Sequence, residues 1–245
     1  MTRITDLDDV YGVPGMLTDG EFEYLYRLAK YNCGKGVIVE IGSRMGRSTI
    51  ALARGTAAVG GEPIFAIDPH KPIPEEGYDE YSEKVFLANL KHASVEDHVV
   101  PMVMTSEQAA AAWNRPIRML WIDGDHRYDA VKLDFVLWER HLVEGGILAM
   151  HDTIRKRGPK RVLWEDVFRS GRFQEIAIVD NITAMHKVQR AALAARLRNY
   201  TTLALRALYI AARKSRIPHS KNTGRRWLKR WTRQSWLPAL LLLYL

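Results

Sequence analysis

The chain has 245 residues, one cysteine and a formal net charge of +8. This length allows one α/β domain with a full core plus an appendage. The lone Cys33 excludes a disulfide framework and a cysteine metal site, so a reducing compartment is expected. We expect no signal peptide at the N-terminus, and the longest apolar run, Ala239 to Leu245, is far shorter than the ~20 residues that span a bilayer.

The charge is distributed unevenly along the chain. All 28 acidic residues lie at or before Asp180, whereas 14 of the 36 lysines and arginines follow it. The first 180 residues therefore carry a net charge of −6 and the remainder +14. This pattern predicts an acidic, enzyme-like body with a basic extension.

The chain divides into three expected units. Residues 1–34 form a polar leader and a helix, in which Thr18 and Glu21 have capping-box spacing ahead of an apolar face. Residues 35–187 form the α/β domain. Residues 188–245 form a basic, amphipathic C-terminal extension.

A strand, a glycine turn and a helix follow the leader. Residues 37–41 are apolar on both faces, as in a central parallel strand, and residues 48–54 have helix-forming composition. The turn between them reads Glu40-x-Gly42-x-x-x-Gly46. Glycines let backbone N–H groups approach a ligand, while the acid would repel a pyrophosphate and accept hydrogen bonds from an ammonium group. A cationic amino-acid ligand is favoured, and the absence of G-x-G-x-x-G disfavours a nicotinamide oxidoreductase.

This motif resembles the first motif of the class I S-adenosylmethionine-dependent methyltransferases. The resemblance implies a Rossmann-like, doubly wound, mostly parallel seven-stranded sheet with helices on both faces. It also implies cofactor contacts around the turn from Glu40, Gly42, Ser43, Gly46 and Ser48. The structural alternative is an ordinary glycine-rich turn.

Two further strand ends carry candidate cofactor residues. The predicted strand 64–67 ends at Asp68 and Pro69, and an acid about twenty residues beyond the glycine turn is placed to bind ribose hydroxyls. The alternative for Asp68 is a strand-end turn. The predicted strand 99–104 ends at Thr105 and Ser106, which either approach an adenine or cap the following helix.

The densest group of ionisable residues follows the next two predicted strands. Strand 117–122 leads into Asp123, Asp125 and His126, and strand 147–150 leads into His151 and Asp152. Buried sheet edges rarely tolerate so many ionisable groups without a use. Clustered carboxylate oxygens suit a divalent cation, above all Mg²⁺.

These two runs are similar to those of the metal-dependent small-molecule O-methyltransferases, including the branch that modifies sugars. The resemblance implies Asp123 as the first metal ligand and Asp152 as the last, with His151 where the family usually has an acid. His126 stands where the catechol branch carries its lysine base. We therefore expect Mg²⁺ at Asp123, His151 and Asp152, and either His126 or His151 as the base. Alternatively, His126 caps a helix and His151 orients Asp152.

The C-terminal extension contains a predicted amphipathic helix from Leu193, followed by Trp227, Trp231, Trp236 and an aliphatic end. Basic residues, interfacial tryptophans and a short apolar terminus suit an anionic membrane surface. The alternatives are a dimerisation arm or a solvated tail, and nucleic acid is disfavoured. The expected location is the cytoplasm, with peripheral attachment to the inner face of the membrane as an option.

Together these features predict an S-adenosylmethionine-dependent O-methyltransferase, assisted by Mg²⁺, that methylates a hydroxyl of a sugar, glycan or related small molecule. The alternative is a non-catalytic protein of the same fold that binds the cofactor or tethers at a membrane. Titration with the cofactor and an assay of methyl transfer distinguish the two.

Overall fold

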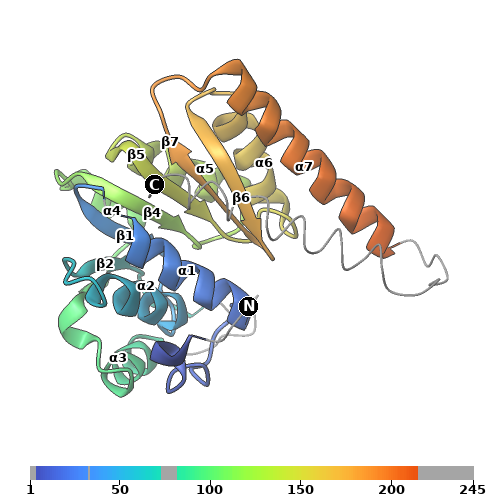
Figure 1. Ribbon diagram of the computed structural model, residues 1–245. Coiled ribbons are helices and arrows are strands. Elements are labelled where there is room, and N and C mark those ends of the chain that lie inside the picture. Colours follow the sequence, from blue (N-terminus) through green and yellow to red (C-terminus); the bar gives the residue numbers. More distant parts are fainter. Residues whose placement is uncertain (1–3, 33, 73–81, 215–245) are drawn as a thin grey trace.

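The computed structural model describes residues 4–32, 34–72 and 82–214. Within them, seven strands form one sheet in the order β3-β2-β1-β4-β5-β7-β6 (Figure 1). Strands β1 to β5 run parallel, whereas β7 is antiparallel to both β5 and β6. The strands are β1 (Val37–Ile41), β2 (Ile64–Ile67), β3 (Val99–Met102), β4 (Ile117–Ile122), β5 (Leu142–Met150), β6 (Phe173–Val179) and β7 (Ile182–Lys187).

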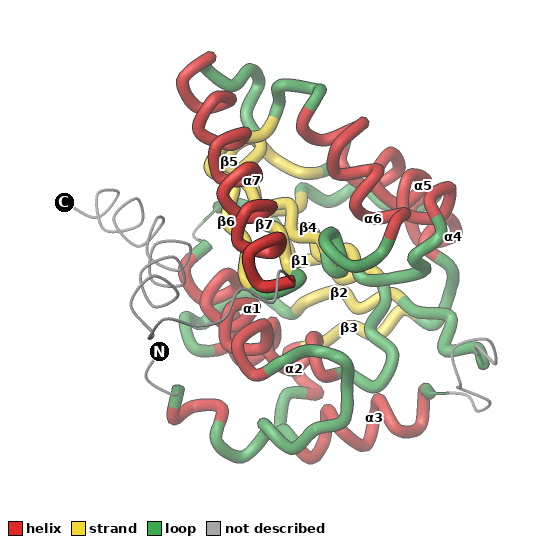
Figure 2. Tube along the Cα trace, turned by 90° about the vertical axis from the view of Figure 1, so that its right-hand side faces the viewer, coloured by secondary structure: helices red, strands yellow, loops and turns green. Residues whose placement is uncertain are grey.

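Helices cover both faces of this sheet (Figures 1 and 2). One hydrophobic cluster joins the sheet to α1, α2 and α3, and a second joins it to α4, α5, α6 and η4. The helices are α1 (Asp19–Tyr31), α2 (Arg47–Ala57), α3 (Glu83–His92), α4 (Ser106–Ala111), α5 (Tyr128–Glu139), α6 (Arg157–Val162) and α7 (Leu193–Lys214), with short turns η1 (Thr5–Leu7), η3 (Glu96–His98) and the π-helical η4 (Leu163–Phe168).

Successive residues of the central strands belong to opposite clusters. In β1, Ile38 packs with α1 and α2, whereas Val39 packs on the other face. In β4, Trp121 likewise packs on the face covered by α1 and α2, and Leu120 packs on the opposite face. Side chains alternate across a strand, so burial on both faces requires the uninterrupted apolar runs of the sequence. The predicted doubly wound α/β fold is confirmed.

Strand β5 differs from its predicted length. It starts at Leu142 rather than at the predicted Ile147, because Gly145 and Gly146 lie inside the strand. Gly145 has φ +77°, and the pairing with β4 shifts from Ile117–Leu142 to Met119–Ile147. A bulge of this kind keeps the strand continuous while bending it.

The C-terminal extension begins as predicted with an amphipathic helix at Leu193. In the part of the chain that the structure describes, no helix is both long and apolar enough to cross a bilayer. The predicted membrane contacts at Trp227, Trp231 and Trp236 lie outside the described residues.

Candidate active site

The turn between β1 and α2 depends on glycine at two positions. Gly42 and Gly46 both have φ +89°, a left-handed conformation that other residues rarely adopt. A Cβ on Gly42 would collide with the main chain of Asp123, so the ends of β1 and β4 can approach closely only at a glycine. The Gly42 N–H donates to Ile67 O, 2.9 Å away, which ties the turn to the end of β2.

Two buried oxygen atoms of this turn have no hydrogen-bond partner among the described residues: Glu40 Oε1 and Ser43 Oγ. The other Glu40 oxygen accepts from the Thr49 hydroxyl at 2.6 Å. Burial raises the pKa of Glu40 to about 8, and the negative charges of Asp123 and Asp68 act in the same direction. Unpartnered oxygen atoms beside three acids suit a ligand with positive charge and hydrogen-bond donors. S-adenosylmethionine, with its ammonium and sulfonium groups, fits this chemistry.

Asp68 follows β2 at the same edge of the sheet. Its two carboxylate oxygens accept from the backbone N–H groups of Arg44, at 2.8 Å, and His70, at 2.7 Å. The side chain is 16% exposed. Asp68 thus joins the glycine turn to the end of β2 and still presents lone pairs to the rim, while Pro69 beside it is exposed. The predicted ribose contact of Asp68 stays a prediction.

Thr105 and Ser106 have local partners of their own. Thr105 caps α4, since its hydroxyl accepts from Gln108 N–H at 3.3 Å and its own N–H donates to the Gln108 side chain at 2.9 Å. Ser106 accepts from the Trp138 indole N–H at 2.8 Å. The capping alternative is therefore confirmed for Thr105, and the adenine contact is not tested. Ser48 is buried at the start of α2, where its hydroxyl interacts with Glu40.

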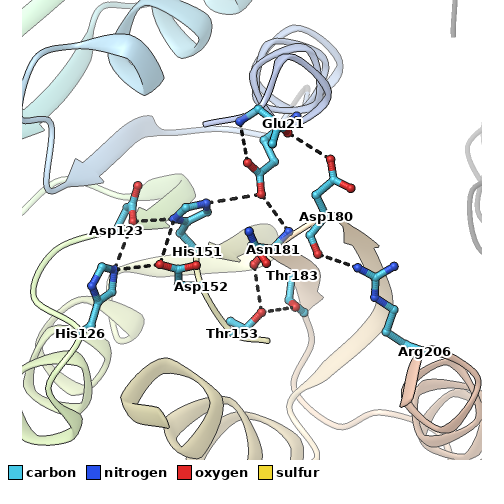
Figure 3. A network of polar contacts seen from close by, with 11 residues as sticks. Glu21, Asp123, His126, His151, Asp152, Thr153, Asp180, Asn181, Thr183 and Arg206 are labelled. Atoms are coloured by element: carbon cyan, nitrogen blue, oxygen red, sulfur yellow. Dashed lines mark hydrogen bonds and ion pairs between the residues drawn. The ribbon is translucent and has the colours of Figure 1, made fainter. Parts of the chain in front are cut away.

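The ends of β4 and β5 bring two acids and two histidines together (Figure 3). His151 Nδ1 lies 3.0 Å from Asp123 Oδ1. His126 Nε2 lies 3.5 Å from Asp152 Oδ2 and 3.9 Å from Asp123 Oδ1. A small pocket is lined by Asp123, His126 and His151 together with neighbouring apolar residues. Asp125 also lines this pocket, and its carboxylate accepts from the backbone N–H and the guanidinium of Arg127.

Glu21, at the start of α1, is a member of this group that the sequence interpretation missed. Its Oε1 lies 3.4 Å from His151 Nε2 and accepts from the Asn181 N–H at 2.8 Å. Its Oε2 accepts from the Thr18 N–H at 2.8 Å, completing the predicted capping box. The side chain is 1% exposed. The capping pattern located Glu21, but no local signal indicated a contact 130 residues along the chain.

Charges in the cluster perturb one another strongly. Burial lowers the pKa of His151, but the contacts with Asp123 and Glu21 prevail and raise it to about 10. Burial raises the pKa of Asp123, yet its interactions with His126 and His151 hold it below the usual value. The contact with Asp123, at 3.9 Å a charge interaction rather than a hydrogen bond, raises the pKa of His126.

The predicted magnesium site does not match this arrangement. Among the described residues, no group of three or more His, Cys, Asp or Glu side chains has a metal-binding arrangement. A metal-ligating imidazole needs a free lone pair, whereas both ring nitrogens of His151 face carboxylates. Asp123 and Asp152 remain as two carboxylates next to His126.

Comparison with known proteins supports the cofactor assignment. Residues 39–153 match the family model of a methyltransferase domain. Similar solved structures include cofactor-bound Rv0187 from MTB, with 19% identity over 74% of this chain and 85% of that one and a TM-score of 0.54. The O-methyltransferase from Bacillus cereus in complex with SAH has 18% identity, 71% and 84% coverage and a TM-score of 0.53. The O-methyltransferase NovP has 16% identity, 71% and 82% coverage and a TM-score of 0.56. At these identities the solved structures show the fold, whereas the family model identifies residues 39–153 as a methyltransferase domain. Residues 39–153 of the chain therefore match a methyltransferase domain, and the sheet that contains them has the Rossmann-like fold of the O-methyltransferases to which it is similar.

Proposed function

We propose that the protein transfers the methyl group of S-adenosylmethionine to a hydroxyl oxygen, with His126 as the general base. The observation that carries this proposal is the position of His126 at the ends of β4 and β5, between Asp123 and Asp152. Its side chain is 24% exposed, so an acceptor can reach it, whereas His151 is 5% exposed and enclosed by carboxylates. Of the two predicted bases, the geometry favours His126.

The chemistry follows from these contacts. The sulfonium of the cofactor is already activated, so the acceptor oxygen is the group that needs help. Neutral His126 takes the hydroxyl proton as that oxygen attacks the methyl carbon and the carbon–sulfur bond breaks. The products are a methyl ether, S-adenosylhomocysteine and an imidazolium at His126. Asp123 and Asp152 stabilise that imidazolium by charge.

A sugar, glycan or related small molecule remains our proposed acceptor. Similar structures include the O-methyltransferases NovP and TomG, the latter involved in tomaymycin synthesis, which supports a hydroxyl of a small molecule as the acceptor. Arg155, Lys156 and Arg157 are exposed next to the pocket, and the positive charge of Lys156 acts on His126. An acceptor with a negative group close to its reactive hydroxyl would suit this rim. The predicted magnesium assistance is not part of the proposal.

The test is release of S-adenosylhomocysteine in the presence of phenols, catechols, nucleotide sugars and glycans. We expect turnover with one of these classes, and loss of turnover in His126→Gln with unchanged affinity for S-adenosylhomocysteine. Tight cofactor binding without transfer to any hydroxyl would instead support the non-catalytic alternative.

A second proposal concerns attachment to an anionic membrane, and its support is the orientation of α7. Asn199 docks this helix on β6, accepting from Ile176 N–H and donating to Phe173 O, each at 3.2 Å. Arg206 on the same side donates to Asp180 O at 2.9 Å. The apolar stripe therefore faces away from the sheet: Leu193, Leu197 and Leu208 are 72%, 57% and 64% exposed.

The occupant that we propose for this stripe is a lipid surface, because the chain after Asp180 carries a charge of +14 and no acid. Each basic residue near an anionic leaflet contributes about 1 kcal/mol. We expect the full chain to co-sediment with phosphatidylserine vesicles and not with phosphatidylcholine vesicles. The double variant Leu197→Glu, Leu208→Glu should lose binding. The matched control, Val59→Glu with Val136→Glu, changes two equally exposed valines elsewhere and should retain it. A dimer that the first variant dissociates would show that a second copy covers the stripe.

A further inference from the structure

The imidazole of His151 is held between two acids that come from distant parts of the chain (Figure 3). Asp123 faces Nδ1 at 3.0 Å and Glu21 faces Nε2 at 3.4 Å. The ring also packs against Trp121, with 5.8 Å between ring centroids. Little of the side chain reaches solvent, so its partners are these residues rather than water.

This arrangement determines the protonation state of the ring. A neutral imidazole has one N–H donor and one lone pair, so one of its nitrogens would direct a lone pair at a carboxylate. An imidazolium donates to Asp123 from Nδ1 and places its positive charge between two negative groups, and the contact of Nε2 with Glu21 is an ion pair rather than a hydrogen bond. The raised pKa of His151 agrees with this assignment. A doubly protonated ring can act neither as a metal ligand nor as a general base.

Glu21 is fixed independently of His151. Backbone N–H groups of Thr18 and Asn181 donate to its two oxygens, so α1 and the β6–β7 turn both orient the carboxylate. Burial raises the pKa of Glu21, but the contact with His151 and these two N–H bonds hold it below the usual value. Glu21 therefore stays ionised and keeps His151 in place.

We propose that Glu21 is a positioning residue that, together with Asp123, holds His151 as a cation between two carboxylates where a divalent metal was expected, so that these residues do not fit a bound metal. The cation offsets the charge of Asp123 and fixes that carboxylate beside His126. The functional role of this arrangement rests on the proposed methyl transfer, whereas the charge state of His151 and the lack of metal binding can be measured in the apoprotein and in its cofactor complex.

The first test needs no acceptor. The full-length protein with S-adenosylhomocysteine is titrated with Mn²⁺, as a reporter for Mg²⁺, and binding is followed by electron paramagnetic resonance. We expect no saturable site at millimolar Mn²⁺, and an affinity for S-adenosylhomocysteine that chelator does not change. Saturable Mn²⁺ binding that Mg²⁺ displaces and Asp123→Asn removes would overturn the proposal.

The second test reads the ring directly by long-range proton–nitrogen nuclear magnetic resonance of labelled histidines. We expect both nitrogens of His151 to stay protonated from about pH 6 to about pH 9, well above the ordinary histidine range. Glu21→Gln keeps the shape but removes the charge, and should bring the titration of His151 into that window, while Glu21→Asp should restore part of the shift. A lone-pair nitrogen on His151 in the wild type would overturn the proposal.

Thr18→Ala is the matched control for loss of the helix cap. It removes the hydroxyl that accepts from Glu21 N–H at 3.2 Å but leaves the Glu21 side chain in place. We expect similar loss of stability in Thr18→Ala and Glu21→Gln, and a change at His151 only in the latter. Equal changes at His151 would show that helix position, not the Glu21 charge, controls the ring. Where an acceptor is known, Glu21→Gln should lower kcat more than it changes KM. If no acceptor is found, the methyl-transfer proposal fails while both physical readouts stand.

Discussion

Replacing Asp68 by alanine tests the cofactor site at its most specific point. Loss of a hydrogen bond to a charged group costs about 1.5–3 kcal/mol, which corresponds to about a tenfold to hundredfold weaker affinity for S-adenosylhomocysteine. The variant also leaves the N–H groups of Arg44 and His70 without their carboxylate partner. Because the site is partly open and water can replace that partner, we expect a stability loss of only about 1–2 kcal/mol.

Calorimetric titration with S-adenosylhomocysteine measures the affinity, and urea unfolding of the apoprotein measures the stability. Asp97→Ala removes an exposed acid in η3 and serves as the control for net charge. Unchanged affinity in Asp68→Ala would refute the ribose assignment. A loss of stability without a loss of affinity would show that Asp68 serves only to join the two turns.

Two further predictions address the glycine turn and the base. Gly42→Ala should unfold at a clearly lower urea concentration and lose cofactor binding, because the added Cβ would collide with the main chain of Asp123 at a residue that is already left-handed. Gly60 also has a positive φ, +64°, but no atom lies near its Cβ position. Gly60→Ala should therefore lower the free energy of unfolding in urea by only about 1–2 kcal/mol. Methyl transfer requires neutral His126, and Asp123 raises the pKa of this side chain above the ordinary value, so kcat should fall as the pH drops through that raised pKa. In Asp123→Asn the midpoint of the pH profile should move to lower pH. A midpoint that does not move would contradict the assignment of His126 as the base.

The fold was predictable because its signals are local. Apolar runs on both faces predict central parallel strands, and three of them, β1, β2 and β4, match their predicted bounds. The glycine turn follows from residue type alone, since only glycine adopts φ +89° without strain. The bulge at Gly145 was missed because a glycine pair gives the same local signal for a turn and for a bent strand.

The site was only partly predictable, because sequence places residues at a sheet edge without giving their orientation. The meeting of Asp123, His126, His151 and Asp152 follows from parallel strands whose carboxyl ends share an edge. The contacts of the two His151 nitrogens depend on the position of α1, which carries Glu21. No sequence pattern predicts how α1 lies over the sheet. The metal prediction therefore treated His151 as a ligand, whereas its Nδ1 lies 3.0 Å from Asp123 and its Nε2 lies 3.4 Å from Glu21.

The Glu21–His151 pair connects α1 to the candidate active site. Removing two charges from water costs several kcal/mol per ion, and a buried pair commonly recovers no more than that cost. An apolar pair in the same place would therefore pack α1 at least as well, so stability alone does not account for these two residues. What an apolar pair cannot supply is a positive charge fixed 3.0 Å from Asp123. The apolar face of α1 also packs into the core shared with α2 and the sheet. We therefore propose that the functional domain includes α1, whereas the predicted boundary at residue 34 would separate Glu21 from His151.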